Sequence, residues 1–253
     1  MWSRIQKSNP AKVIASLVAL IMMAFIVPPK EITIWMIGDS TMAQKTKNAF
    51  PETGWGMEFG KYFDNGVLIK NKAKNGRSTK SFINEKRWDS VLENIKEGDY
   101  VFIQFGHNDE KIDKPTVGTS IAEFKANLVK FVVETRAKGG IPVLFTPVTR
   151  RSFKDGLLTD SHGNYPAATI SVADSLHVLF IDMLLKSKNY VSTLGDEPSK
   201  LLYNYVDSGN VNYPAGKKDD THFSPVGANK MAGLAVEGIK ELKLELVKRL
   251  LNE

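Results

Sequence analysis

Short runs of β-branched and aromatic residues alternate with amphipathic segments along most of the chain after residue 31. Each run is apolar at consecutive positions, which is typical of strands that are covered on both faces. Because strands alternate with helices, the pattern predicts a parallel sheet flanked by helices, which is an α/β fold. The expected strands are Ile32–Ile37, Val67–Asn71, Tyr100–Phe105, Pro142–Thr146 and Val178–Asp182.

The segments between these runs have helical periodicity. The expected helices are Thr79–Ile95, Ser120–Lys138 and Tyr165–Leu176. A last helix is expected from Pro225 to about Leu251, because Ser224 is a favourable N-cap and proline suits the first turn. No repeat or linker interrupts the pattern, so we expect a single domain over residues 30–253. In such sheets ligands bind beyond the carboxyl ends of the strands, so we expect the functional residues in the loops that follow the strands.

The N-terminal segment has a different character. Residues 1–12 are polar and basic, residues 13–27 form an apolar run interrupted only by Ser16, and two prolines end it. A bilayer span needs roughly 20 apolar residues, whereas the apolar part of a signal peptide needs about 7–15. We therefore predict a signal peptide over residues 1–28, with an uncleaved membrane anchor as the alternative. Either interpretation places the domain outside the cytoplasm, as a secreted or periplasmic protein.

Composition excludes several other classes. The chain of 253 residues is 42% hydrophobic and 25% charged, as in ordinary globular proteins. It has no cysteine, which rules out disulfides, thiolate catalysis and cysteine-based metal sites. Arg4, Lys7 and Lys12 supply three of the six net positive charges, so the remainder is only mildly basic. No basic run is interleaved with aromatic residues, and a nucleic-acid partner is not expected.

Three short polar segments follow predicted strands. Ser40 lies in a Gly-Asp-Ser-Thr segment after the first strand, at the expected edge of the sheet. Gly76 lies in Asn-Gly-Arg-Ser, where a glycine lets a backbone N–H approach a ligand oxygen closely. Asn108 lies in Gly-His-Asn-Asp, and its amide can donate to a developing oxyanion. Each segment taken alone is also compatible with ordinary turn chemistry.

A fourth segment, Asp-Asp-Thr-His, immediately precedes the last predicted helix. Asp219 lies three residues before His222, a spacing that lets a carboxylate hold Nδ1–H and leave Nε2 as a base. Asp220 is the competing carboxylate, but its side chain should point elsewhere. Metal binding is a weaker alternative because no further ligands accompany the pair. Of the other histidines, His162 is expected to be solvated or near substrate, and His177 to be structural.

Together the four segments supply a serine, two oxyanion donors and a carboxylate–histidine pair, which is a complete set for acyl transfer. The signatures of other hydrolases and of nucleotide-binding proteins are missing: there is no G-x-S-x-G, H-E-x-x-H or G-x-x-x-x-G-K-[ST]. The sequence therefore predicts an acyl-transfer enzyme with a serine nucleophile.

The same residues carry a family resemblance. The sequence resembles the SGNH (GDSL-type) hydrolases, named for a Ser, Gly, Asn and His in four blocks, here Ser40, Gly76, Asn108 and His222. Asp219 fits the D-x-x-H pattern of the last block. Within the family the chain is most similar to the rhamnogalacturonan acetylesterases. The matching segments are GDSTMA (38–43), NGRSTKSF (75–82), GDYVFIQFGHNDEK (98–111), TPVTRRSF (146–153) and DDTHFSPVGA (219–228).

The resemblance implies a flavodoxin-like three-layer α/β/α sandwich with a five-stranded parallel sheet. It also implies a triad of Ser40, His222 and Asp219. The implied oxyanion hole consists of the Ser40 N–H, the Gly76 N–H and the Asn108 amide. The resemblance implies neither a metal nor an organic cofactor. The implied activity is removal of acetyl groups from a pectic rhamnogalacturonan backbone outside the cell.

The loops expected around the site are rich in Lys, Arg and Asp, which favours a polar or anionic substrate over an acyl lipid. We expect Arg77, His107 and Arg150 to contact an acetylated pectic polysaccharide or oligosaccharide, bound by a monomer. Alternative substrates are other acyl esters, as for a GDSL-type esterase or lipase, or another acetylated polysaccharide such as xylan. A non-catalytic carbohydrate-binding module is a further alternative, but an intact triad argues against it.

Overall fold

A computed structural model describes residues 31–251, and the chain from Ile32 onward forms one compact unit. The predicted signal peptide over residues 1–28 lies outside the described residues. Five strands form a parallel sheet in the order β2-β1-β3-β4-β7. They are β1 (Ile32–Gly38), β2 (Val67–Asn71), β3 (Tyr100–Gln104), β4 (Ile141–Phe145) and β7 (Leu179–Ile181). The predicted α/β fold is confirmed.

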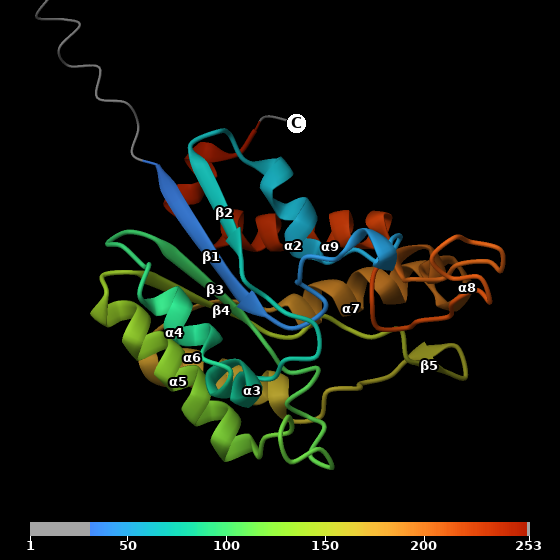
Figure 1. The fold of residues 1–253 in the computed structure, drawn as a ribbon, viewed down its shortest axis with the longest axis horizontal. Helices are drawn as coiled ribbons and strands as arrows, with labels where there is room; N and C mark the ends of the chain where they lie inside the picture. The colour runs from blue at the N-terminus through green and yellow to red at the C-terminus, as the bar shows by residue number, and fades with distance from the viewer. Residues whose placement is uncertain (1–30, 252–253) are drawn as a thin grey trace, which may run out of the picture. The chain divides into compact units, whose positions relative to one another are not determined.

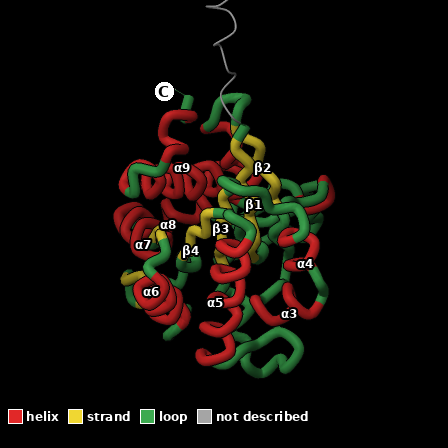
Figure 2. The backbone as a smooth tube through the Cα atoms, turned by 90° about the vertical axis from the view of Figure 1, so that its left-hand side faces the viewer, coloured by secondary structure: helices red, strands yellow, loops and turns green. Residues whose placement is uncertain are grey.

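Helices cover both faces of this sheet, as Figures 1 and 2 show. Side chains alternate along β1, so that Ile34 and Met36 enter one core while Trp35 and Ile37 enter the other. The first core is closed by α2 (Trp55–Glu58), α7 (Met183–Leu194) and α9 (Pro225–Glu241). The second is closed by α3 (Thr79–Asn84), α4 (Arg87–Leu92), α5 (Ile121–Ala137) and α6 (Tyr165–Leu176). The predicted three-layer sandwich is therefore present.

Smaller elements lie in the connections. A hairpin of two very short antiparallel strands follows β4, and its strands are β5 (Phe153–Lys154) and β6 (Leu157–Leu158). One short helix follows α7, namely α8 (Asp196–Ser199). The 3-10 helices are η1 (Lys47–Ala49), η2 (Phe59–Tyr62), η3 (Lys200–Leu202) and η4 (Glu245–Arg249). Elements of two to five residues have too little periodicity to be predicted from sequence.

Two predicted helices differ from the observed ones for a local reason. The helix expected over 79–95 is divided into α3 and α4, because Lys86 adopts a left-handed conformation with φ 56°. The helix expected to reach Leu251 ends at Glu241, and Lys243 is left-handed with φ 51°. Its start is as predicted, since the Ser224 hydroxyl accepts the Gly227 N–H at 3.1 Å.

The sheet brings distant loops to one end, where the strands finish. The close packing of β1 against β3 explains Gly38, because a Cβ there would lie 2.6 Å from the Gln104 carbonyl oxygen. The loop before α9 reaches the same end, as the contact between Ser40 and His222 shows. Within residues 31–251, no helix has the length and apolar character needed to cross a bilayer.

Candidate active site

A continuous hydrogen-bond chain links Ser40, His222 and Asp219. Ser40 Oγ lies 2.9 Å from His222 Nε2, and His222 Nδ1 lies 2.9 Å from Asp219 Oδ2. Ser40 comes from the turn after β1, whereas the other two residues come from the loop before α9. The His222 side chain keeps 27% of its surface exposed, so the chain is accessible from solvent. The structure thus brings together the three residues that the sequence analysis named for the triad.

The Asp219 carboxylate is fixed by its own loop. Its Oδ1 accepts the backbone N–H groups of Thr221 and His222 at 2.9 and 3.0 Å. Burial alone would raise its pKa, but the hydrogen bonds from His222 and these N–H groups hold the pKa well below its usual range. An ionised Asp219 accepts Nδ1–H, which leaves the Nε2 lone pair of His222 facing the Ser40 hydroxyl.

The neighbouring carboxylate faces another way. Asp220 Oδ1 accepts hydrogen bonds from Arg151 Nη1 and from the Tyr205 hydroxyl, each at 2.7 Å. Arg151 also pairs with Asp196. The two adjacent aspartates therefore serve different partners, as the sequence analysis expected from their spacing to His222.

The loops after β1, β2 and β3 each carry one of the donors expected for the oxyanion hole. Within the described residues, the N–H groups of Ser40 and Gly76 have no hydrogen-bond acceptor. Gly76 has φ +75°, a conformation that a side chain would strain. Asn108 Nδ2 donates to the Arg77 carbonyl at 3.1 Å, and Lys111 Nζ donates to Asn108 Oδ1 at 2.7 Å. Because an ammonium only donates, Lys111 fixes which end of the amide carries the N–H groups.

A second aspartate–histidine pair lies behind the site. Asp39 Oδ2 lies 3.3 Å from His107 Nδ1, and the two side chains are 0% and 2% exposed. Burial would raise the pKa of Asp39, yet His107 and the hydrogen bonds from Thr41 lower it to about 2. Burial lowers the pKa of His107 to about 4, so its ring is neutral at pH 7. At this burial His107 presents no surface to a substrate, contrary to the sequence expectation.

The two arginines expected to bind substrate are already paired within the protein. Arg77 Nε donates to Glu85 at 2.9 Å, and Arg77 Nη1 donates to the Asn75 carbonyl at 2.9 Å. Arg150 pairs with Glu110 through Nη2. Their side chains are 31% and 19% exposed, so both remain accessible in part. Their charges are largely compensated, which weakens their attraction for an anionic group.

His162 is buried, and the expectation that it is solvated or near substrate is wrong. Its Nε2 lies 2.9 Å from the Val148 carbonyl oxygen, and its Nδ1 lies 2.9 Å from Glu110 Oε2. The ring also packs edge-on against His107, with centroids 4.5 Å apart. These partners come from segments distant in sequence, so a local Ser-His-Gly-Asn turn gave no sign of them.

Asp109 connects two of the site loops from below. Its Oδ1 accepts the backbone N–H of Thr79 at 3.0 Å and the Thr79 hydroxyl at 2.5 Å. Thr119 donates to the same oxygen at 3.2 Å. Burial raises the pKa of Asp109 to about 7, and the hydrogen bonds from Thr79 offset only part of that effect. This residue thus joins the loop of Asn108 to the start of α3.

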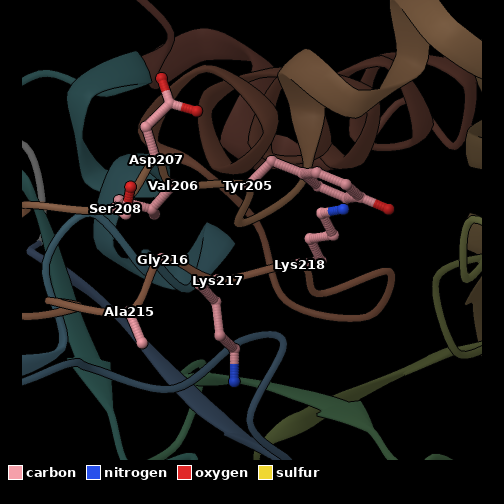
Figure 3. A pocket seen from close by; sticks show the side chains of 8 residues that line it. All are labelled: Tyr205, Val206, Asp207, Ser208, Ala215, Gly216, Lys217 and Lys218. Carbon is pink, nitrogen blue, oxygen red and sulfur yellow. The ribbon is translucent and has the colours of Figure 1, made fainter.

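Two hollows, each of about 380 Å³, lie near the loop that carries Asp219 and Asp220. One is lined by Arg150–Phe153 together with Ser161, Asp196 and Asp220. The other lies between residues 205–208 and 215–218, where Figure 3 shows Asp207 and Lys217 extending in opposite directions. Lys217 Nζ lies 3.5 Å from Asp219 Oδ2, which places this second hollow next to the triad loop.

The described part of the chain holds no group of three or more His, Cys, Asp or Glu side chains that could bind a metal ion. The Asp219–His222 pair, for which metal binding was the alternative, is instead linked to Ser40 Oγ through His222 Nε2. The geometry is therefore that of a nucleophile, a base and a carboxylate that orients the base.

Comparison with known proteins agrees with this geometry. Residues 36–230 match the GDSL-like lipase/acylhydrolase family. The chain belongs to this family. Rhamnogalacturonan acetylesterase RhgT of Bacillus subtilis strain 168 is 41% identical over 225 residues, which make up 88% of this chain and 96% of that protein. The probable rhamnogalacturonan acetylesterase YesY of the same organism is 34% identical over 87% of this chain and 98% of that protein.

The fold is also shared with a solved relative. The crystal structure of the Bacillus subtilis protein YxiM superposes with a TM-score of 0.72 at 28% identity, covering 86% of this chain and 58% of that chain. The predicted family resemblance is confirmed, and with it the class of carboxylic ester hydrolase.

Sequence reasoning missed the supporting roles of several residues. Lys111, which orients Asn108, was not singled out, and His107 was expected to contact substrate rather than to pair with Asp39. Closeness to a motif in the sequence was the only signal available for them. Their roles depend on which distant side chain they meet, and that depends on the three-dimensional arrangement of the loops.

Proposed function

We propose that this protein is a secreted carbohydrate O-acetylesterase that removes acetyl groups from pectic rhamnogalacturonan through an acyl-enzyme. The observation that carries the proposal is the chain of 2.9 Å contacts from Ser40 through His222 to Asp219. The secreted location rests on the basic and apolar pattern of residues 1–28.

In the first half-reaction, Ser40 Oγ attacks the acetyl carbonyl carbon while His222 Nε2 takes the hydroxyl proton. Asp219 stabilises the imidazolium that forms and keeps Nδ1 protonated. The tetrahedral intermediate then breaks its bond to the sugar oxygen. That oxygen leaves with the proton from Nε2, and the acetyl group stays on Ser40.

The second half-reaction returns the enzyme to its resting state. A water molecule gives a proton to His222 Nε2 as its oxygen attacks the acetyl carbonyl carbon. The new intermediate releases Ser40 Oγ, which recovers the proton from His222, and acetate departs. No redox step is required, because both halves are acyl transfers.

Three donors are available for the negative oxygen of both intermediates: the Ser40 N–H, the Gly76 N–H and the second hydrogen of Asn108 Nδ2. Two of them have no acceptor within the described residues, so they need not exchange a protein partner for the oxyanion. Donors fixed in advance stabilise the transition state more than the ground-state carbonyl.

The choice of substrate is supported by relatives and by charge. RhgT and YesY carry the name of rhamnogalacturonan acetylesterases at 41% and 34% identity. The hollows near the loop of Asp219 include lysine, arginine and aspartate side chains among their lining residues. A polar acetylated polysaccharide suits such walls better than a long acyl chain does.

The test is acetate release from acetylated rhamnogalacturonan, compared with acetylxylan, a long-chain acyl ester and p-nitrophenyl acetate. We expect the highest kcat/KM on rhamnogalacturonan and no release by Ser40→Ala. A higher kcat/KM on acetylxylan would show that xylan, and not rhamnogalacturonan, is the substrate. A higher kcat/KM on the long-chain ester would show that the protein is a lipase. Binding of the polysaccharide without turnover would indicate a carbohydrate-binding module.

A further inference from the structure

Lys45 is a buried lysine close to the nucleophile. Its side chain is 1% exposed, which is rare for lysine unless the ammonium is fully paired. Lys45 Nζ donates to the Ser40 carbonyl oxygen at 2.6 Å and to Asn75 Oδ1 at 2.7 Å. It also lies 2.6 Å from Glu52 Oε1. An ammonium has three donor hydrogens, and these three acceptors use all of them.

The acceptors belong to two loops of the proposed oxyanion hole. Ser40 carries the nucleophile and one N–H donor, and Asn75 immediately precedes Gly76. The Asn75 carbonyl, which shares a peptide group with the Gly76 N–H, accepts from Arg77 Nη1 at 2.9 Å. Lys45 therefore ties the turn after β1 to the loop after β2, through the carbonyl of the nucleophile residue and the side chain of the residue before Gly76.

We propose that Lys45 is a positioning residue that sets the distance between the Ser40 N–H and the Gly76 N–H, so that both reach one oxygen. The inference rests on the proposed function, because it assigns these N–H groups to the oxyanion. A purely structural role is a poor account of a charged group here. Buried ion pairs contribute little to stability compared with an apolar side chain of the same volume.

The third donor has an additional support of its own. Asn108 is oriented by Lys111 on the loop after β3, and its hydrogen bonds reach the loop after β2 only through the Arg77 carbonyl, not through Lys45. Loss of Lys45 should therefore displace the Ser40 and Gly76 donors most and affect Asn108 less. The carboxylates that act on the Lys45 charge are Glu52, Asp39 and Asp219, whose attraction opposes the lowering of its pKa by burial.

The experiment compares Lys45→Met with wild type on p-nitrophenyl acetate. We expect kcat to fall by about 10- to 100-fold with little change in KM, as for a small misplacement of reacting groups. Inhibition by methylboronic acid, which forms a tetrahedral adduct with a serine, should weaken by a similar factor. The control is Lys47→Met, which removes the same charge from an exposed position two residues away and should leave kcat unchanged.

A milder variant covers the case in which Lys45→Met does not fold. Asn75 is exposed, so Asn75→Ala removes one acceptor of Lys45 without burying or exposing a charge. We expect kcat about tenfold lower with an unchanged melting temperature, and recovery in Asn75→Asp, which restores an acceptor oxygen. Wild-type kcat and boronate affinity in folded Lys45→Met, or in Asn75→Ala, would overturn the inference.

The design separates this inference from the proposed function. A wild-type enzyme that cleaves p-nitrophenyl acetate but not acetylated rhamnogalacturonan overturns the substrate, while the Lys45 comparison still decides the positioning role. Full activity of Ser40→Ala overturns the serine mechanism and the Lys45 inference together. A loss in melting temperature with normal kcat in the folded fraction of Lys45→Met overturns the positioning role alone.

Discussion

The protein contains two aspartate–histidine pairs at the same end of the sheet, and they differ in what surrounds the imidazole. In Asp219–His222 the ring keeps 27% of its side chain exposed and meets Ser40 Oγ on its far nitrogen. In Asp39–His107 both side chains are almost fully buried, and His107 Nε2 has no hydrogen-bond partner among the described residues. The comparison teaches that an aspartate next to a histidine does not by itself make the histidine a base. The ring must also be exposed, and its Nε2 must face a hydroxyl group that can give up a proton.

The first prediction concerns the partner of the Asp219–His222 pair, which we call the open pair because its ring is partly exposed. Ser40→Ala removes the proposed acceptor of the acetyl group, so kcat should fall by roughly a millionfold. The fold should be unaffected, because His222 is the hydrogen-bond partner of Ser40 Oγ within the described residues. Ester hydrolysis and thermal unfolding measured on one preparation check this, and near-normal turnover would refute it.

The second prediction asks which carboxylate serves the open pair. Asp219→Asn cannot hold the same tautomer of His222, and kcat should fall by about 10⁴-fold. Asp220→Asn is the matched control, because Asp220 faces Arg151 and Tyr205. It should lower kcat by less than about tenfold. The two rates on p-nitrophenyl acetate decide the matter, and the reverse order would move the triad to Asp220.

The third prediction concerns the amide donor Asn108, which directly follows His107 in the sequence. Asn108→Ala should lower kcat by about a hundred- to a thousandfold with little change in KM. Asn108→Asp should be at least as damaging, because a carboxylate would face the oxyanion. If Asn108 only stabilises its turn, steady-state kinetics and melting curves will show an unstable but fully active alanine variant.

The fourth prediction concerns the buried Asp39–His107 pair, which we call the closed pair. His107→Ala removes a buried ring and leaves a cavity beside Asp39, so the free energy of unfolding should fall by about 3 kcal/mol. Since His107 does not reach the reacting atoms, the pH profile of kcat should keep its shape in the folded variant. Urea unfolding and a pH series measure both. A changed profile without loss of stability would assign His107 to the chemistry.

The fifth prediction is the smallest and uses pH. The pKa of Asp109 is about 7 in the folded protein, above the ordinary value of 3.8. The stabilisation from this group is then complete below pH 4 and is lost as pH rises through 7. Asp109→Asn should remove this component, so that the variant gains stability relative to wild type between pH 5 and pH 8. Urea midpoints at both values test it, and a constant difference would contradict it.

The strands could be predicted from sequence because each is an apolar run bounded by polar segments, and all five occur where such runs lie. The helix α7 was not expected, since it begins directly after β7 with Asp182 as its N-cap and gives no separating loop. The break between α3 and α4 at Lys86 could not be predicted either, because no sequence pattern marks a lysine with a left-handed backbone conformation. Helix ends depend on packing that periodicity does not report.

For the site, the sequence named Ser40, His222 and Asp219, and the structure places their side chains in one hydrogen-bond chain. It could not tell that His107 is enclosed or that Lys45 is paired on three sides. Those properties follow from side chains contributed by other loops. A motif residue is recognisable from its neighbours in the chain, whereas a supporting residue is recognisable only from its neighbours in space.

The nucleophile and its base are separated by 182 positions in the chain. During synthesis the serine is therefore made long before the histidine that activates it. A chain that stops before residue 219 contains Ser40 but neither Asp219 nor His222, so on the proposed mechanism it has no base for the serine. On the same proposal, hydrolysis can begin only after the segment that carries residues 219–222 has been made and has folded against the turn after β1.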